Sequence, residues 1–403
     1  VFRELFSGLG GSWKRACLQS IGRHPQCFYS NQLEICLKRI RTLLYNEEKF
    51  MPRTMTSKER VKAAFAHNPV DRVPMMILLG ETWMIEREKI SFKDLREMDD
   101  LGAELIVRTY DEMQSDSVTT GLGCWIGLLE ALGCPTEISK IGAPIEVKPC
   151  IHDVAADISS LDRSKIRERL ENSELIQKMM RQSREIKKLV GDRKSVAGQM
   201  VGPFSGASMM VGVKEFMILL GKKSPYIKPL LEYATDCCAE IANMYCENGC
   251  DLIQTCDPCS SGDMISPKMY EQHVVPTLEG LTSQLKNCET FLLHICGKAG
   301  MRLPHVKALG IDGFSVDSPV DLKESLEAAG QELTMVGNFN PNELLCMGTS
   351  EAVYAAAYAN AEIAGLDGGY VMMPGCDLAA RTPLENILAM VRASSDYAAS
   401  VRN

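Results

Sequence analysis

Three residues have the types and spacing of a metal site. His294 and Cys296 stand two positions apart at the end of the apolar run TFLLHICG (290–297), and Cys376 follows Pro374-Gly375 at the end of another apolar run. If 290–297 is a strand, His294 and Cys296 point to the same face. Zinc prefers imidazole and thiolate ligands, and three protein ligands leave a fourth position open for chemistry. We therefore expect a catalytic zinc on these three side chains.

Zinc that already carries two thiolates favours the binding of one more thiol. The metal lowers the pKa of that thiol until a thiolate forms near neutral pH, and the thiolate then attacks an activated carbon such as a methyl group. Activation of water is less favoured, because thiolate ligands reduce the Lewis acidity of the metal. The alternative is an ordinary buried strand that happens to end in His and Cys.

The elements that must position these residues alternate along the chain from residue 55. Short apolar runs, expected as strands, lie at 73–80, 104–110, 194–204, 251–258, 290–297, 312–319, 333–341 and 368–376, with long helices at 162–190 and 227–247. Continuous apolar runs indicate strands buried on both faces, and their alternation with helices indicates a parallel sheet. Eight such units predict an α/β fold, a (β/α)₈ TIM barrel. A doubly wound sheet is the alternative, but the first run lacks its glycine-rich fingerprint.

Polar residues end most of these runs, at the edge where a barrel gathers its active site. Besides the proposed ligands they are Glu81, Asp111, Gln199, Asp257, Asp317 and Asn338. We expect Gln199, Asp257, Asp317 and Asn338 to line the cavity and to orient ligands or substrate. Turn formation and helix capping are the alternative roles for such residues.

Residues 1–54 differ from the rest of the chain. Residues 1–45 hold seven Lys and Arg against two acids, and the sequence begins with Val. We interpret 1–54 as an N-terminal extension outside the (β/α)₈ main domain, 55–403. It is a translated leader upstream of a start at Met51 or Met55, a structured helix pair, or a targeting peptide.

The composition argues against two classes of partner, nucleic acids and membranes. The formal net charge of −8 provides no electrostatic footprint for nucleic acid, and no apolar run approaches the roughly 18–20 residues that cross a membrane. Sixteen cysteines without a secretory signal favour free thiols in a reducing compartment. We expect a cytoplasmic protein.

Four stretches carry a family resemblance: FLLHICG (291–297), GFSVDSPVDLKE (313–324), MVGNFNP (335–341) and MMPGCDLAARTPLENILAMV (372–391). With the opening MTSKERVKAAFAHNPVDRVP (55–74), they resemble the uroporphyrinogen decarboxylase superfamily. The chain is similar to its zinc-dependent branch of methylcobamide:coenzyme M methyltransferases and related corrinoid methyltransferases. The resemblance implies a TIM barrel with zinc on His294, Cys296 and Cys376. It implies methyl transfer between a separate corrinoid (methylcobalamin) protein and a zinc-bound thiol such as coenzyme M.

Other activities stay open within this resemblance. A substrate:corrinoid methyltransferase takes the methyl group from a methoxy or methylamine donor, which zinc polarises, and loads it onto cob(I)alamin. Decarboxylases of the superfamily carry an arginine-rich segment after the first strand, whereas here it reads LLGETWMIE (78–86), without arginine. A zinc-binding paralogue without turnover is a further alternative.

Overall fold

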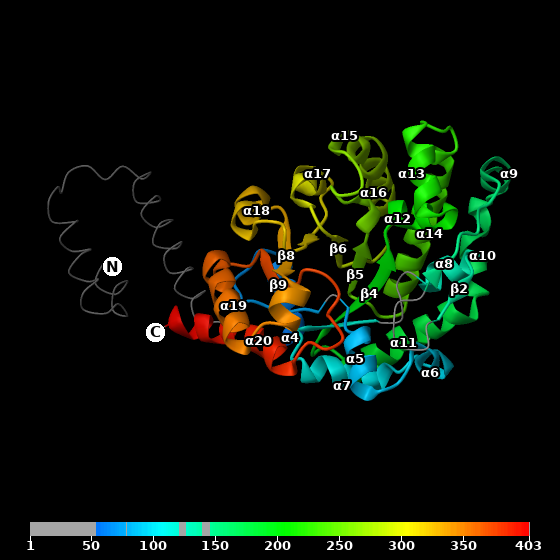
Figure 1. The fold of residues 1–403 in the computed structure, drawn as a ribbon. Coiled ribbons are helices and arrows are strands. Elements are labelled where there is room, and N and C mark those ends of the chain that lie inside the picture. The colour runs from blue at the N-terminus through cyan, green and yellow to red at the C-terminus, as the bar shows by residue number, and fades with distance from the viewer. Residues whose placement is uncertain (1–53, 78, 121–125, 139–145, 403) are drawn as a thin grey trace, which may run out of the picture. The chain divides into compact units, whose positions relative to one another are not determined.

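Seven parallel strands form the central sheet of the computed structural model. The structure describes residues 54–403 except 78, 121–125, 139–145 and 403, so the extension expected at 1–54 lies almost wholly outside the described residues. The strands follow chain order: β1 (Ser117–Thr119), β4 (Ser195–Val201), β5 (Leu252–Cys256), β6 (Thr290–Ile295), β7 (Gly313–Val316), β8 (Thr334–Phe339) and β9 (Tyr370–Pro374). Figure 1 shows this sheet curled, with helices around it.

Helices connect consecutive strands, as the parallel pairing requires. The described helices are α4 (Ser57–Phe65), α5 (Glu81–Glu88), α6 (Phe92–Glu97), α7 (Ala103–Glu112), α8 (Ile126–Ala131), α9 (Val154–Ser159), α10 (Ile166–Glu171), α11 (Glu174–Val190), α12 (Pro203–Val211), α13 (Val213–Gly221), α14 (Ile227–Glu247), α15 (Pro267–Met269), α16 (Val275–Thr282), α17 (Leu303–Ala308), α18 (Leu322–Ala329), α19 (Ser350–Ala364) and α20 (Leu384–Ser400). Short 3-10 turns lie at Arg163–Lys165, Pro258–Ser260 and Gly300–Arg302, and π-helical turns at Tyr270–Val274 and Pro341–Cys346.

The expected first strand at 73–80 is present as a single parallel bridge, Met75 with Met372. The backbone N–H of Met76 donates to the carbonyl oxygen of Met372 in β9 at 2.9 Å. On the other side, the N–H of Asp116 donates to the carbonyl oxygen of Met75 at 2.7 Å, just before β1. Residues 73–77 therefore contact both edge strands of the sheet.

A buried ion cluster fixes this segment to α4. Arg60 donates to Asp71 and, at 2.6 Å, to Asp116 Oδ1, while Arg72 donates to Asp116 Oδ2 at 2.9 Å. The charges are paired and hydrogen-bonded, the condition under which ions are tolerated inside a protein.

The side chains inside the curled sheet form an apolar layer followed by a polar one. Ala197, Leu252, Leu292, Val336 and Val371 pack together with Val61 and Ala64 of α4. Side chains two positions further along a strand lie on the same face. On β4, β6 and β8 these positions hold Gln199, His294 and Asn338, nearer the carboxyl ends. The polar groups therefore gather at one end of the sheet.

The expected strand at 104–110 is wrong, because this stretch is helix α7. Its buried residues include Ala103, Ile106, Val107 and Tyr110, which share one helical face. The strand here is the short β1 further along the chain. Asp111 consequently ends no strand: it lies in α7, 41% exposed, and pairs with Lys194 at 2.6 Å. Glu81 likewise begins α5.

The helix expected at 162–190 is interrupted. Ser173 caps a new helix, α11, by accepting a hydrogen bond from Ile176 N, so α10 and α11 are separate. The structure also contains a hairpin that the sequence did not predict, β2 (Thr136–Glu137) with β3 (Glu146–Val147).

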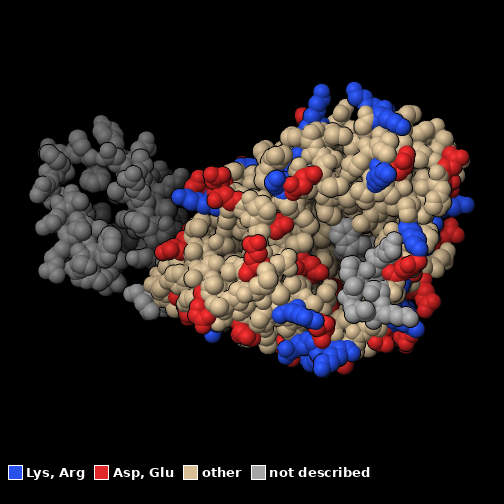
Figure 2. Space-filling model, viewed as in Figure 1, with Lys and Arg blue, Asp and Glu red and all other residues tan. Residues whose placement is uncertain are grey.

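Among the described residues no single helix is long and apolar enough to cross a membrane, although α12 and α13, bent by 105° at their junction, reach the required length and composition as a pair. Figure 2 shows Lys and Arg interspersed with Asp and Glu over the viewed face of the described residues.

Candidate metal centre

The three predicted ligands meet at the carboxyl ends of β6 and β9. His294 Nε2 lies 3.1 Å from Cys296 Sγ, which lies 3.6 Å from Cys376 Sγ. One ligand atom from each residue lies within 4.8 Å of the other two. His294 is buried and both cysteines are half-buried. Residues 80 positions apart in the sequence therefore form one cluster.

The spacing of these atoms fits one tetrahedral zinc ion. Two thiolates at about 2.3 Å from a tetrahedral zinc lie about 3.8 Å apart. The observed Sγ–Sγ distance of 3.6 Å is close to that value. Two sulfurs and one imidazole nitrogen are also a donor set that zinc prefers, so the residues fit this metal.

Ser315 orients the imidazole. The parallel register of β6 and β7 sets Ser315 opposite His294, and both side chains lie on the same face. Ser315 Oγ lies 2.9 Å from His294 Nδ1. This contact occupies Nδ1 and leaves Nε2 facing the cysteines, the arrangement that outer groups impose on metal-binding histidines.

The electrostatics of the cluster favour a cation. The hydrogen bond from Cys296 lowers the pKa of Cys376 to about 4, against the effect of burial. The same pairing raises the pKa of Cys296. Burial opposes a charge on His294, but its hydrogen bond with Cys376 and the negative charges of Cys256, Cys376 and Asp317 together outweigh burial and raise the imidazole pKa. A metal that binds here would displace the proton on Cys296.

Asp317 lies between the two cysteine-bearing loops. Its Oδ2 accepts a hydrogen bond from Gly297 N at 3.0 Å, and its Oδ1 accepts one from Ser318 N at 2.6 Å. A Cβ atom on Gly375 would stand 2.8 Å from Asp317 Oδ1. Gly297, with φ of +65°, follows Cys296, and Gly375 precedes Cys376. One carboxylate therefore constrains the backbone next to both sulfur ligands.

Asn338 supports the loop that carries Asp317. Its Nδ2 donates to the carbonyl oxygen of Val320 at 2.5 Å and lies 3.5 Å from that of Asp317. The structure thus brings Asn338 to the β7–α18 loop through backbone contacts.

Asp257 and Gln199 serve other contacts. Asp257 is fully buried and accepts hydrogen bonds from Ser205 N and Oγ, at 2.7 and 2.5 Å, and from Phe204 N, at 3.3 Å, at the start of α12. Burial raises its pKa to about 6. Gln199 Nε2 lies 3.5 Å from Cys256 Sγ, and Cys256 stands opposite His294 in the register of β5 and β6.

Several neighbours of the centre were not predicted from the sequence. Ser315 and Cys256 are placed beside His294 only by strand register. Asp377, directly after Cys376, is half-buried and accepts a hydrogen bond from Thr82 Oγ1 at 3.3 Å. Burial and the negative charge of Cys376 raise the pKa of Asp377 to about 7. Asp377 is visible in the sequence only as a turn residue after the strand.

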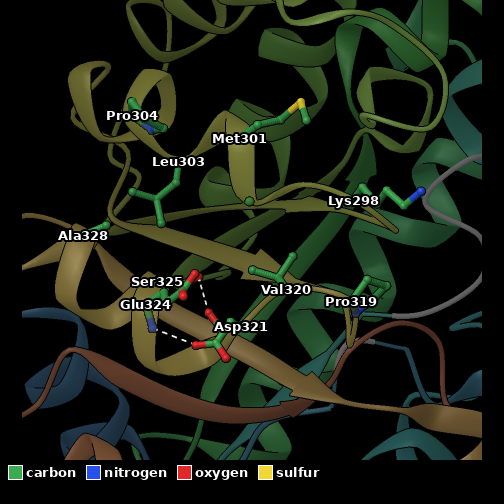
Figure 3. A pocket seen from close by; sticks show the side chains of 11 residues that line it. Lys298, Met301, Leu303, Pro304, Pro319, Val320, Asp321, Glu324, Ser325 and Ala328 are labelled. Carbon is green, nitrogen blue, oxygen red and sulfur yellow. Dashed lines mark hydrogen bonds between the residues drawn. The ribbon is translucent and has the colours of Figure 1, made fainter.

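A groove of about 350 Å³ borders the loop that follows Cys296. Figure 3 shows Met301, Leu303 and Pro304 on one side and Pro319 and Val320 on the other. Lys298 at its edge is 71% exposed and pairs with Asp263 at 3.4 Å.

Comparisons with known proteins extend over most of the chain. The family described as Uroporphyrinogen decarboxylase (URO-D) matches residues 56–397. The chain is 28% identical over 346 residues to methylcobamide:CoM methyltransferase MtaA of Methanosarcina barkeri, covering 85% of this chain and 98% of the relative. It is 25% identical over 300 residues to uroporphyrinogen decarboxylase of Myxococcus xanthus, covering 71% of this chain and 82% of the relative.

A solved structure shares the fold. The structure of a methyltransferase from Methanosarcina mazei aligns with a TM-score of 0.75 and 27% identity, covering 85% of this chain and 99% of that one. The resemblance found in the sequence is thereby confirmed at the level of the family. The match over residues 56–397 shows that the chain belongs to the uroporphyrinogen decarboxylase (URO-D) family.

Proposed function

We propose that this protein is a zinc-dependent methyltransferase that moves a methyl group between a methylated corrinoid and a zinc-activated thiol. The observation that carries the proposal is the convergence of His294, Cys296 and Cys376, whose ligand atoms lie within 4.8 Å of one another. The relative from Methanosarcina barkeri, named for methylcobamide:CoM methyltransfer, supports the same chemistry.

Zinc at this centre would bind the substrate thiol in its fourth position and hold it as a thiolate. The protein's own side chains position the ligands. Ser315 holds the ring of His294, so that Nε2 faces the metal position. Asp317 fixes the backbone after Cys296 and limits the space before Cys376. Because holding two reactants in line removes much of the entropic barrier, this preorganisation contributes directly to rate.

Roles for the other predicted residues follow from their contacts. We propose that Asp317 and Asn338 act by fixing the loops, and that Gln199 acts through Cys256 beside His294. Asp257 would act by fixing the start of α12. None of these roles requires contact with the methyl group.

The partners follow from the reaction. We propose that a corrinoid protein presents methylcobalamin to the carboxyl ends of the strands, and that a small thiol such as coenzyme M is the acceptor. We also propose that residues 73–77 complete an eight-stranded barrel, since Met76 bonds to β9 and Ile77 O accepts from Thr119 Oγ1 in β1 at 3.1 Å. A functional domain of 55–403 agrees with the family match beginning at residue 56. A cytoplasmic location suits the sixteen cysteines.

A methyl-transfer assay tests the proposal. The zinc-loaded full chain is mixed with methylcobalamin and a panel of thiols, and both demethylation of the cobalamin and the methyl thioether product are measured. We expect turnover with at least one thiol, its loss in Cys376→Ala, and its retention in Cys346→Ala, a half-buried cysteine used as the matched control.

Two results would overturn it. Zinc-loaded protein that is inert with every thiol, but loads methyl groups from methoxy or methylamine donors onto cob(I)alamin, would assign the donor-side reaction. Release of carbon dioxide from uroporphyrinogen would assign decarboxylation, which the arginine-free segment 78–86 argues against.

A further inference from the structure

Two cysteines outside the metal centre lie in contact with each other. Cys134 Sγ and Cys150 Sγ are 3.3 Å apart, at the base of the β2–β3 hairpin. The hairpin register pairs Thr136 with Val147, and Lys148 N donates to Pro135 O at 2.8 Å. One further step along the ladder sets Cys134 opposite Pro149, directly before Cys150. The two thiols therefore meet because of strand pairing.

Hydrogen bonds fix the backbone at both cysteines. Cys134 N donates to Leu129 O at 2.9 Å, at the end of α8. The N–H groups of Cys150 and Ile151 donate to the carbonyl oxygen of Met210 in α12, at 3.0 and 2.9 Å. A disulfide requires the sulfurs to close to about 2.05 Å. From 3.3 Å the two sulfurs must therefore approach by about 1.2 Å.

The two thiols differ in access and in charge. Cys134 is 2% exposed, whereas Cys150 is half-buried. Arg169 is adjacent: its Nε donates to Ala131 O at 2.8 Å, and its Nη2 lies 3.0 Å from where a Cβ on Gly133 would stand. The hydrogen bond from Cys134 and, to a smaller extent, the charge of Arg169 lower the pKa of Cys150 against the effect of burial. The pairing with Cys150 and burial raise the pKa of Cys134. A cation beside a half-exposed thiol favours the reactive thiolate.

We propose that Cys134 and Cys150 form a reversible disulfide site that small-molecule disulfides oxidise, separate from the metal centre. The Cys150 thiolate attacks one sulfur of the oxidant, forms a mixed disulfide and releases one thiolate of the oxidant. Cys134 then loses its proton and attacks Cys150 Sγ, which forms the protein disulfide and releases the second thiolate. The protein loses two protons and two electrons, and the oxidant becomes two thiols.

The site is distinguishable from the sulfur pair at the metal centre. Cys296 Sγ and Cys376 Sγ are 3.6 Å apart, but zinc bound as proposed above would occupy both as ligands. The experiment therefore uses zinc-loaded full chain and monitors zinc content throughout.

Peptide mapping after equilibration with reduced and oxidised glutathione tests the proposal. The protein is quenched in acid and alkylated, and proteolytic peptides are identified by mass. We expect a peptide cross-linked through Cys134 and Cys150 to rise from a trace to most of the protein as the mixture becomes oxidising, and to disappear with dithiothreitol. Zinc content should not change.

Single variants separate the two steps. Cys134→Ser should accumulate glutathione on Cys150, and Cys150→Ser should remain unmodified at Cys134. Cys346→Ser, the matched half-buried control, should cross-link like the wild type. Wild type that stays fully alkylated at both positions in oxidised glutathione, or that holds glutathione on Cys150 without a cross-link, overturns the proposal.

Discussion

The carboxylate of Asp317 accepts a hydrogen bond from the backbone N–H of Gly297 at 3.0 Å, directly after Cys296. The same carboxylate stands 2.8 Å from the position of a Cβ on Gly375, directly before Cys376. The backbone next to both sulfur ligands, which come from distant strands, is thus constrained by the carboxylate of Asp317. This relationship makes Asp317 a positioning residue, whose loss should change metal binding more than it changes folding.

Replacing Asp317 should weaken zinc binding. In Asp317→Ala, Gly297 N loses its acceptor and both loops gain freedom, so we expect zinc affinity to fall about 10- to 100-fold, the usual effect of removing an outer support. Competition with a zinc-binding dye measures it. The matched control is Asp321→Ala in the same connection, where Asp321 caps α18 by accepting from Glu324 N. The control should lose about 1 kcal/mol of stability and retain zinc affinity. Equal zinc affinity in both variants contradicts the positioning role.

Gly375→Ala should disturb the same support from the other loop. The new Cβ would lie 2.8 Å from Asp317 Oδ1 and 2.9 Å from Ser318 N, closer than packed atoms tolerate, so Cys376 must shift. We expect lower zinc affinity, measured by the same competition. Gly221→Ala, where a Cβ meets nothing within 4 Å, is the control. Full zinc affinity in Gly375→Ala would show that the loops accommodate a side chain there.

Ser315→Ala should loosen the imidazole. His294 Nδ1 loses its partner at 2.9 Å, so the ring is no longer held with Nε2 toward the cysteines. We expect about tenfold weaker zinc binding. Ser315→Thr retains the hydroxyl and should restore most of the affinity. If the Ser315→Ala and Ser315→Thr variants bind zinc equally well, the hydroxyl of residue 315 has no role in orienting the imidazole.

The free energy of unfolding of the protein should depend on pH through the ionisation of Asp257. Burial raises its pKa from 3.8 to about 6, so the folded chain binds this proton more tightly than the unfolded chain. The resulting stabilisation is present below about pH 4 and is lost as the pH rises through about 6. Relative to Asp257→Asn, the free energy of unfolding of the wild type should fall by up to about 3 kcal/mol across that window. Urea unfolding of both proteins at several pH values measures this change. A difference in the free energy of unfolding that stays constant across about pH 4–6 would exclude a raised pKa of Asp257.

Much of the fold could be predicted from the sequence because buried parallel strands are continuous apolar runs. The ends of β6 and β9 were predicted to within two residues, which puts His294, Cys296 and Cys376 at the carboxyl edge of the sheet. Residues 104–110 were misassigned, because an apolar helical face and a short strand resemble each other over seven residues, and because the true β1, Ser117–Thr119, has no apolar run.

Tertiary contacts explain what the sequence could not predict about the site. Ser315 meets His294 only through the register of β6 and β7, and Asp317 meets Gly297 only when two loops fold together. Asp257 looked like a cavity residue at the end of β5, but α12 begins beside it and takes its carboxylate as a cap. Hydrophobic periodicity carries no information about such pairings.

X-ray absorption at the zinc edge tests the central claim most directly. Zinc in the purified full chain should show two sulfur neighbours at about 2.3 Å together with nitrogen or oxygen neighbours at about 2.0–2.1 Å. Addition of the thiol that supports methyl transfer should raise the sulfur count to three. A shell without sulfur, or one that thiol leaves unchanged while methyl transfer proceeds, would contradict zinc activation of the thiol at His294, Cys296 and Cys376.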